Sequence, residues 1–135
     1  MATPIYHLDT STVVLFLRAK SQKLRAKINS VSPGQLGVSQ VVRAELLVGC
    51  LKSQRPVAHR EQVDRFLANV TTVDLDASCA DCYAEIRAAL ESAGKVIGPN
   101  DLFIAATARA AAAILVTENE KEFRRVPGLK VENWS

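Results

Sequence analysis

Cysteine, histidine and tryptophan are scarce in this chain, which holds three, two and one of them among 135 residues. An odd, small number of cysteines does not suggest a disulfide framework, and Met1–Tyr6 has no signal-peptide anatomy. We therefore expect a reducing, cytoplasmic setting. No apolar run approaches the roughly 20 residues of a membrane span, so we expect no contact with a membrane.

Several nucleotide-binding and catalytic motifs are also missing. The sequence contains no GxxxxGK[ST], so no P-loop cradles a nucleoside triphosphate, and it contains no GxGxxG for a dinucleotide. No nucleophile-elbow motif supports a Ser-His-Asp triad. His7 and His59 are too few and too scattered to suggest a histidine-based metal site.

Charge of neither sign dominates, because 17 Lys and Arg residues face 14 Asp and Glu residues, for a net charge of +3. The basic residues do cluster, in Arg18–Lys27, Arg43–Arg65 and Lys121–Lys130. A solvated helical surface explains most such clusters, and a weak nucleic-acid footprint is the alternative.

Cys79 and Cys82 have the C-x-x-C spacing of a redox or metal site. A structural zinc site needs four ligands, and no second pair of cysteines is visible. Cys79 instead shares a helical stripe with Tyr83, Ile86 and Leu90, where cysteine is a good small core residue. We therefore predict buried structural thiols.

Short apolar runs alternate with helical patterns along the chain, which predicts βαβ units and an α/β fold with a parallel sheet. No repeat or linker interrupts them, so a single domain over residues 1–135 is the simplest prediction. The expected strands are Ile5–Leu8, Leu36–Val38, Val70–Leu75, Ile114–Val116 and Leu129–Val131. The expected helices are Thr10–Arg18, Gln22–Val31, Ser39–Leu51, His59–Leu67, Asp76–Ala93, one that begins at Pro99 and a short one over Asn119–Glu122. Ser39 and Asp76 are expected N-caps and Gly94 an expected stop, while the β-branched residues of Thr10–Arg18 leave a strand open as the alternative there. We expect turns at Ser32–Gly34 and Arg125–Gly128 and a break in the chain at Ser53–Val57.

The stretch Gly98–Phe123 organises these elements. Pro99 suits the first turn of a helix, and the carboxylate of Asp101 suits the positive end of its dipole. The residues that follow are almost all apolar, which predicts a buried helix. Ala110–Ala113 supplies no Gly or Asn to end it, so either the helix stops without a left-handed cap or an alanine bears a strain of roughly 1 kcal/mol.

Three acids lie where acids are unusual. Asp9 ends a buried strand, Glu45 shares a helical face with valines, and Asp101 shares one with Ile104 and alanines. Charged side chains are almost never fully buried unless paired. Each acid is either paired with its own arginine, or all three meet at the carboxyl edge of the sheet, where Asn119 and Glu122 follow the fourth strand.

The second arrangement requires a cation. Two carboxylates about 5 Å apart repel by roughly 3 kcal/mol at an effective dielectric of 20, and three or four would destabilise the fold or take up protons. Oxygen-only ligands suit Mg²⁺ or Mn²⁺, and the usual chemistry of such a site is phosphoryl transfer. Two polar residues support the site's helices: Ser39 as an N-cap, and Thr117, from which a capping box with Glu120 is expected.

The chain resembles the PIN-domain nucleases, and specifically the VapC-type toxins of bacterial toxin–antitoxin pairs. The resemblance covers essentially the whole chain: YHLDTS is similar to the family's YLLDTN opening, and VSQVVRAELLVGCLKS to its S-x-x-x-x-x-E-L-x-x-G-x-x-K-S helix. The most distinctive part is GPND before an apolar helix, followed by T-x-N-x-x-E-F and VPGL-x-x-x-x-W.

The resemblance implies a twisted parallel sheet and a metal site. Asp9 and Asp101 would ligate Mg²⁺ or Mn²⁺ directly, Glu45 would hold the ion or a water on it, and Asn119 and Glu122 would orient outer waters or a second ion. It also implies an endoribonuclease that stops translation by cutting tRNA or ribosomal RNA. Its expected partners are RNA, a small cognate antitoxin and a second copy of the chain, with DNA bound only through the antitoxin.

Two positions depart from the family pattern. Ser11 replaces the usual Asn after Asp-Thr, which loosens the expected hydrogen bonding of Asp9, and Glu118 replaces an Asn or Asp. Neither removes an expected ligand, so we expect activity to survive.

Two other functions remain open from the sequence: a PIN nuclease that processes RNA without an antitoxin, and a binding module whose acidic pocket holds an antitoxin Arg or Lys. Arg43 or Lys121 is placed either to touch the RNA backbone or simply to be solvated. The segment Val13, Val14, Phe16 and Leu17 forms either part of a partner groove or an internal core face.

Overall fold

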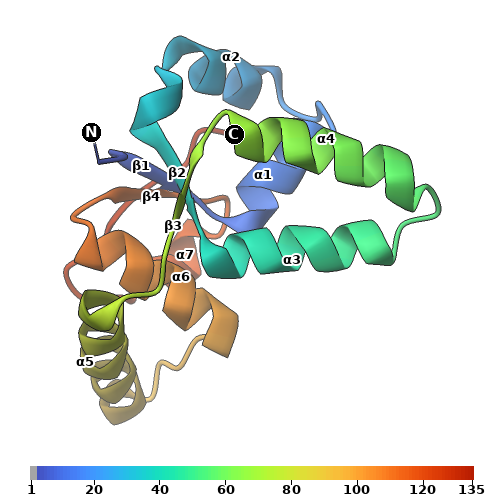
Figure 1. Ribbon diagram of the computed structural model, residues 1–135. Helices are drawn as coiled ribbons and strands as arrows, with labels where there is room; N and C mark the ends of the chain where they lie inside the picture. Colours follow the sequence, from blue (N-terminus) through green and yellow to red (C-terminus); the bar gives the residue numbers. More distant parts are fainter. Residues whose placement is uncertain (1–2) are drawn as a thin grey trace.

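A five-stranded, fully parallel sheet forms the centre of the computed structural model, which describes residues 3–135 (Figure 1). The strand order is β3-β2-β1-β4-β5, so the first strand lies in the middle. The strands are β1 (Tyr6–Leu8), β2 (Leu36–Ser39), β3 (Thr71–Val73), β4 (Ile114–Val116) and β5 (Lys130–Glu132). The sequence-based prediction of an α/β fold with about five short parallel strands is confirmed.

Seven α-helices surround the sheet within the described part of the chain (Figure 1). They are α1 (Thr10–Leu17), α2 (Gln22–Ser30), α3 (Gln40–Leu51), α4 (Pro56–Ala68), α5 (Ala77–Ala93), α6 (Pro99–Ala110) and the single turn α7 (Glu120–Phe123), with a 3₁₀ turn at Pro33–Gln35. Helices α5 and α6 pack against each other, and α3 and α4 form a hairpin that extends away from the sheet (Figure 1).

The hydrophobic core lies along the three central strands. Leu8, Val38 and Leu115 are completely buried, because β1, β2 and β4 have a strand on each side and helices over them. From α6, Ala105, Ala106 and Ala108 are also completely buried, as the apolar sequence of this helix predicts. Their small side chains let α6 approach the sheet closely.

Several predicted boundaries are wrong by a few residues. The largest difference is at Pro56, which we expected in a chain break but which is the first residue of α4. Proline is tolerated there because the first turn of a helix has no partner for its N–H. The third strand is also shorter than the predicted Val70–Leu75, since Asp74 leaves the sheet to accept a hydrogen bond from Gln40 at 2.8 Å. Thr10–Leu17 is a helix, which removes the alternative of a strand.

Two alanines adopt the left-handed conformation at helix ends. Ala112, just after α6, has φ of 53°, so the strained alternative predicted for the alanine run is confirmed. The N–H of Ala113 reaches back to the carbonyl of Ala108 at 2.9 Å, as in a glycine-capped helix end. Ala19, after α1, has the same φ of 53°, which the sequence pattern did not suggest. Gly94 ends α5 with φ of 67°, as predicted.

The three cysteines are free thiols. Cys50 and Cys79 are buried, while Cys82 is half-buried and packs against the core. The prediction of structural thiols is therefore confirmed, with Cys82 less enclosed than expected. Within residues 3–135, no helix is long and apolar enough to cross a membrane.

Candidate active site at the carboxyl edge of the sheet

The topology brings the predicted acids to one place. Strands β2, β1 and β4 are neighbours and run in the same direction, so the segments that follow them start from the same edge of the sheet. Asp9 follows β1, Glu45 lies on α3 after β2, and Glu122 lies on α7 after β4. Asp101, in the first turn of α6, faces the same edge, since its electrostatic neighbours are these three acids.

Asp9 is held by hydrogen bonds on both carboxylate oxygens. It is the N-cap of α1 and accepts from the backbone N–H of Thr12 at 2.9 Å. The hydroxyl of Thr117 donates to its other oxygen, Oδ2, and only 4% of Asp9 is exposed. The hydroxyl of Ser11 also lies within hydrogen-bonding distance of both oxygens, at 3.1 and 3.3 Å. We expected Ser11, which departs from the family pattern, to loosen the hydrogen bonding of Asp9, but the contact is present.

Thr117 has a different role from the one predicted. Its hydroxyl accepts the N–H of Asn119 at 2.9 Å while donating to Asp9, so it does not form a capping box with Glu120. Asn119 is the N-cap of α7, and its side chain makes no capping hydrogen bond. The capping-box prediction is therefore wrong. The buried hydroxyl joins the end of β4 to the acid that ends β1.

Glu45 is oriented by two residues that sequence reasoning did not select. The hydroxyl of Thr10 donates to one carboxylate oxygen at 2.6 Å, and the amide of Asn100 donates to the other at 3.4 Å. Both residues adjoin predicted acids in the sequence, at Asp9-Thr10 and Asn100-Asp101, which is the signal that could have found them. Ser39 caps α3, accepting the N–H of Val42 at 3.1 Å, as predicted.

Asn119 and Glu122 lie together, as their spacing predicts. The side-chain amide of Asn119 donates to a carboxylate oxygen of Glu122. The remaining oxygen of Glu122 has no hydrogen bond to any residue of 3–135, so it remains available to face the other acids.

The electrostatics of the edge are those of uncompensated negative charge. The pKa of Asp101 is raised to about 6, first by burial and then by the nearby charges of Glu122, Glu45 and Asp9. The four salt bridges within residues 3–135 involve none of these acids. The alternative in which each acid is paired with its own arginine is therefore wrong for the described chain.

The donor set suits a hard divalent cation. It consists of carboxylate oxygens, and His7 is buried in the core with neither ring nitrogen hydrogen-bonded. Within residues 3–135, however, no three His, Cys, Asp or Glu side chains are close enough to form a compact ligand group. Mg²⁺ does not require such a group, because it keeps several waters and is usually held by one or two carboxylates together with substrate phosphates.

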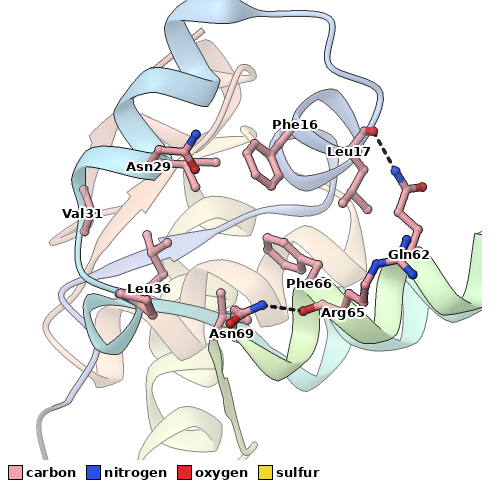
Figure 2. A pocket seen from close by; sticks show the side chains of 12 residues that line it. Phe16, Leu17, Asn29, Val31, Leu36, Gln62, Arg65, Phe66 and Asn69 are labelled. Atoms are coloured by element: carbon pink, nitrogen blue, oxygen red, sulfur yellow. Dashed lines mark hydrogen bonds between the residues drawn. The ribbon is translucent and has the colours of Figure 1, made fainter.

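Two cavities border the end of helix α1, and one of them also borders one of the acids. A small one, of about 120 Å³, is bordered by Glu45 and lies among α1, α3 and α4. A larger groove, of about 510 Å³, lies among α1, α2 and α4 and contains none of the predicted acids (Figure 2). Phe16 and Phe66, whose ring centroids are 5.9 Å apart, line this groove. We call it the α1–α2–α4 groove.

The segment we considered for a partner groove is divided among these places. Val13 is completely buried in the core, and Val14 borders the small cavity. Phe16 and Leu17 line the α1–α2–α4 groove (Figure 2). Val13 is thus part of the core, and binding of a partner by Phe16 and Leu17 stays a prediction.

Comparison with known proteins gives a consistent result. The family model described as "PIN domain" matches residues 6–129. The chain is 39% identical to ribonuclease VapC2 of Rickettsia felis and 35% identical to the tRNA(fMet)-specific endonuclease VapC of Shigella flexneri. Each alignment covers 96% of this chain and 98% of the relative.

Two of the solved structures with the same fold are VapBC complexes bound to DNA. One is DNA-bound VapBC from Salmonella typhimurium, with a TM-score of 0.93 and 30% identity over 98% of this chain and all of the other. Another is VapBC2 from Rickettsia felis bound to a DNA fragment from their promoter, with a TM-score of 0.90 and 36% identity over 96% of this chain and 98% of the other. The likeness therefore extends over nearly the full length of both chains.

Proposed function

The chain belongs to the PIN-domain family and is similar throughout its length to VapC ribonucleases, and we propose that it is a Mg²⁺- or Mn²⁺-dependent endoribonuclease toxin. The observation that carries the proposal is that Asp9, Glu45, Asp101 and Glu122 lie close enough to repel one another while none of them is in a salt bridge within residues 3–135. The repulsion among these carboxylates destabilises the fold at the carboxyl edge of the sheet, where ligands of α/β proteins bind, and a bound divalent cation would remove it.

Each acid has a distinct part in the proposed reaction. Asp9, fixed by Thr12 and Thr117, and Asp101 would hold the ion. Glu45, fixed by Thr10, would hold the ion or a water on it, and Glu122 with Asn119 would orient outer waters or a second ion.

When bound, the ion lowers the pKa of water and neutralises charge growing on the phosphate. Hydrolysis adds water across the bond between phosphorus and O3′, leaving a 5′-phosphate and a 3′-hydroxyl. The acids that face the water accept its proton, and the departing O3′ takes one up.

The substrate class that we propose is structured cellular RNA, either tRNA or ribosomal RNA. One relative is named as a tRNA(fMet)-specific endonuclease, which makes a total tRNA pool the first substrate to test. Arg43, half-buried on α3, and the exposed Lys121 on α7 lie on the elements of the site and are candidates for contact with the RNA backbone.

The test is cleavage of that pool by the purified, partner-free chain with Mg²⁺, with Mn²⁺ and with EDTA. Metal-dependent fragments that disappear in Asp101→Asn and persist in Glu61→Gln are expected, since Glu61 is an exposed acid on α4. Cleavage of neither tRNA nor ribosomal RNA by folded protein would favour the binding module. Equal cleavage by Asp101→Asn would show that the site is elsewhere or that the activity is a contaminant.

We also propose that the α1–α2–α4 groove receives the antitoxin. Its walls are apolar, from Phe16, Leu17 and Phe66, and polar groups of Asn29, Arg65 and Asn69 stand around them (Figure 2). Apolar walls with a polar rim suit an amphipathic helix, and similar solved structures are complexes of VapC with VapB.

Val31→Asp, at the half-buried edge of the groove, tests this assignment. The variant is expected to keep metal-dependent RNA cleavage and to lose co-purification with the product of the neighbouring reading frame. If no small antitoxin frame neighbours the gene, the chain is an RNA-processing PIN nuclease instead. The resemblance also predicts a homodimer, and sedimentation of the free chain would measure whether its mass is that of two copies.

A further inference from the structure

The small cavity beside Glu45 has the character of a binding site for a planar, polar group. Its apolar wall is made by Val14, Leu17 and Leu46, and its volume is about 120 Å³. Arg18, His59 and Gln62 supply a cation, an aromatic ring and an amide at the same cavity. Apolar walls with a few polar groups are the usual composition of a small-molecule site.

Gln62 separates this cavity from the α1–α2–α4 groove, because Gln62 and Leu17 line both. One N–H of the Gln62 amide donates to the carbonyl of Leu17 at 2.9 Å (Figure 2). The amide oxygen and the second N–H have no hydrogen bond to residues 3–135, so they are available to a ligand. The amide is thereby held in place while keeping a donor and an acceptor.

Gly49 keeps the cavity open. It lies inside α3, where glycine is less stable than alanine by roughly 0.5–1 kcal/mol. An alanine would fit at this position, because within residues 3–135 a Cβ at Gly49 would have no neighbour closer than Cε1 of His59, at 3.9 Å. Its helical backbone does not need glycine. Gly49 and His59 line the cavity together, so a larger side chain at Gly49 would reduce its volume.

Several basic residues follow Arg18 of the cavity in the sequence. Arg18 begins a run of five cations, and no Asp or Glu occurs from Thr10 to Ala44. All five are exposed and none is in a salt bridge within residues 3–135; they are Arg18, Lys20, Lys23, Arg25 and Lys27. Exposed cations without salt bridges suit a phosphate backbone, and of the five only Lys27 has a cation–π contact within residues 3–135, with its Nζ 5.5 Å from the ring centroid of Trp134.

We propose that this cavity receives one unstacked base of the RNA, adjacent to the phosphate that is cut, an assignment that rests on the proposed nuclease function. His59 stacks on the base, Gln62 hydrogen-bonds its edge, and Arg18 meets the phosphate that leads to the basic run. Proteins that select RNA sequence commonly splay bases out in this way and hold them with aromatic, arginine and amide side chains.

Direct binding tests the cavity without any cleavage. The probes are the four nucleoside 5′-monophosphates, and the readouts are the NMR shifts of the Gly49 amide and the His59 ring. At least one nucleotide is expected to shift both signals to saturation, and Gly49→Leu, which fills the space, is expected to abolish the change. Ala58→Leu, on an exposed position of α4 outside the cavity, is the matched control and should bind like wild type. Absence of shifts with all four nucleotides would overturn the assignment.

Cleavage of oligonucleotides with one randomised position gives the second measurement. His59→Ala and Gly49→Leu are expected to lower kcat/KM about tenfold through KM, the size of one lost stacking contact, and to flatten the base preference beside the cut. Asp101→Asn should instead abolish cleavage of every sequence. An unchanged KM and base preference in both cavity variants would refute the base site while leaving the nuclease intact. Nucleotide binding by a chain that cuts no RNA would support the cavity and refute the nuclease.

Discussion

Thr117 shows how a single buried hydroxyl connects two strand ends. It donates to Asp9 and accepts from the backbone of Asn119. Thr117→Val keeps the shape and removes both contacts. We expect a loss of roughly 10–100-fold in kcat/KM, the usual range for groups that orient ligands, and a fall of about 1–2 kcal/mol in the free energy of unfolding.

Thr107→Val is the matched control for this change. Thr107 is equally buried, but its hydroxyl donates to the carbonyl of Phe103, at 2.7 Å within α6, rather than to an acid. Kinetics and urea denaturation of both variants are compared. Similar activity in the two would mean that the hydroxyl of Thr117 does not position Asp9.

Asp101 is expected to destabilise the metal-free fold. Its pKa in the folded chain is about 6, against an ordinary value of 3.8. Above pH 6 the carboxylate is therefore charged in an environment that favours the neutral form. The stability that the protonated form provides is complete below pH 3.8 and is lost as the pH rises through 6. Asp101→Asn should therefore raise the free energy of unfolding in EDTA at pH 7.5 by about 1–2 kcal/mol, after allowance for solvent screening.

Urea denaturation of the two proteins across this pH range measures the effect. The difference should vanish near pH 4, where the wild-type carboxyl is protonated as well. A variant that is less stable than wild type at pH 7.5 would contradict the proposed crowding of the acids. Glu61→Gln, which removes an exposed carboxylate of α4, is the matched control.

His7 acts in the opposite direction over a similar pH range. Burial lowers its pKa from 6.5 to about 4, and neither ring nitrogen has a partner. Its contribution to stability is complete above pH 6.5 and is lost as the pH falls toward 4, because the unfolded chain takes up a proton that the folded chain does not. The shift corresponds to at most about 3 kcal/mol.

His7→Leu is expected to remove this loss. When the pH falls from 7.5 to 5, the free energy of unfolding should fall less for the variant than for wild type, or rise, because the opposite contribution of Asp101 is the same in both proteins. An unchanged difference in His7→Leu would mean that the histidine finds a partner or is protonated in the fold.

At the scale of elements, the helix ends carry the clearest strain. Ala112 and Ala19 both have φ of 53°, where a Cβ is unfavourable. Ala112→Gly should raise the free energy of unfolding by about 0.5–1 kcal/mol, since the relieved strain exceeds the added chain entropy. Ala88→Gly, on the exposed side of α5, should lower it by about 1 kcal/mol. Thermal melts of the two variants would contradict this account if they moved in the same direction.

The elements themselves were largely predictable from the sequence. Alternating strand and helix patterns, Gly94 as a stop and Ser39 as a cap all correspond to the structure. The beginning of α4 at Pro56 was not predicted, because a proline both breaks and starts helices and only the following residues decide which. Thr117 was misassigned because its partner, Asp9, lies 108 residues away, and local spacing cannot show such a contact.

The site was predictable to a similar degree. Asp9, Glu45 and Asp101 stood out as acids on apolar faces, and the structure places them near Glu122. Thr10 and Asn100 were missed because neutral polar residues at helix starts are common, and only their contacts to Glu45 distinguish them. Their geometry depends on how α1, α3 and α6 meet, which no single segment encodes.

For the whole molecule, the divalent ion should be a stabiliser. A ligand that binds only the folded chain raises stability by RT ln(1 + [L]/Kd), or about 2.7 kcal/mol at 100 times Kd. Mg²⁺ should therefore raise the melting temperature of wild type and EDTA should reverse the rise. Asp101→Asn, more stable without metal, should show a much smaller increase. Equal increases in the two proteins would place the ion elsewhere.

The central position of β1 also fixes when the chain becomes an enzyme during its synthesis. β1 is made first, yet one of its two neighbours, β4, is separated from it by more than a hundred residues. Until β4 and α7 are made, Asp9 lacks Thr117 and the site lacks Glu122. A ribosome that stalls before β4 therefore releases a fragment with most of the acids but without a complete site. A cell that makes this chain is therefore exposed to the complete site only after translation has entered the last quarter of the chain.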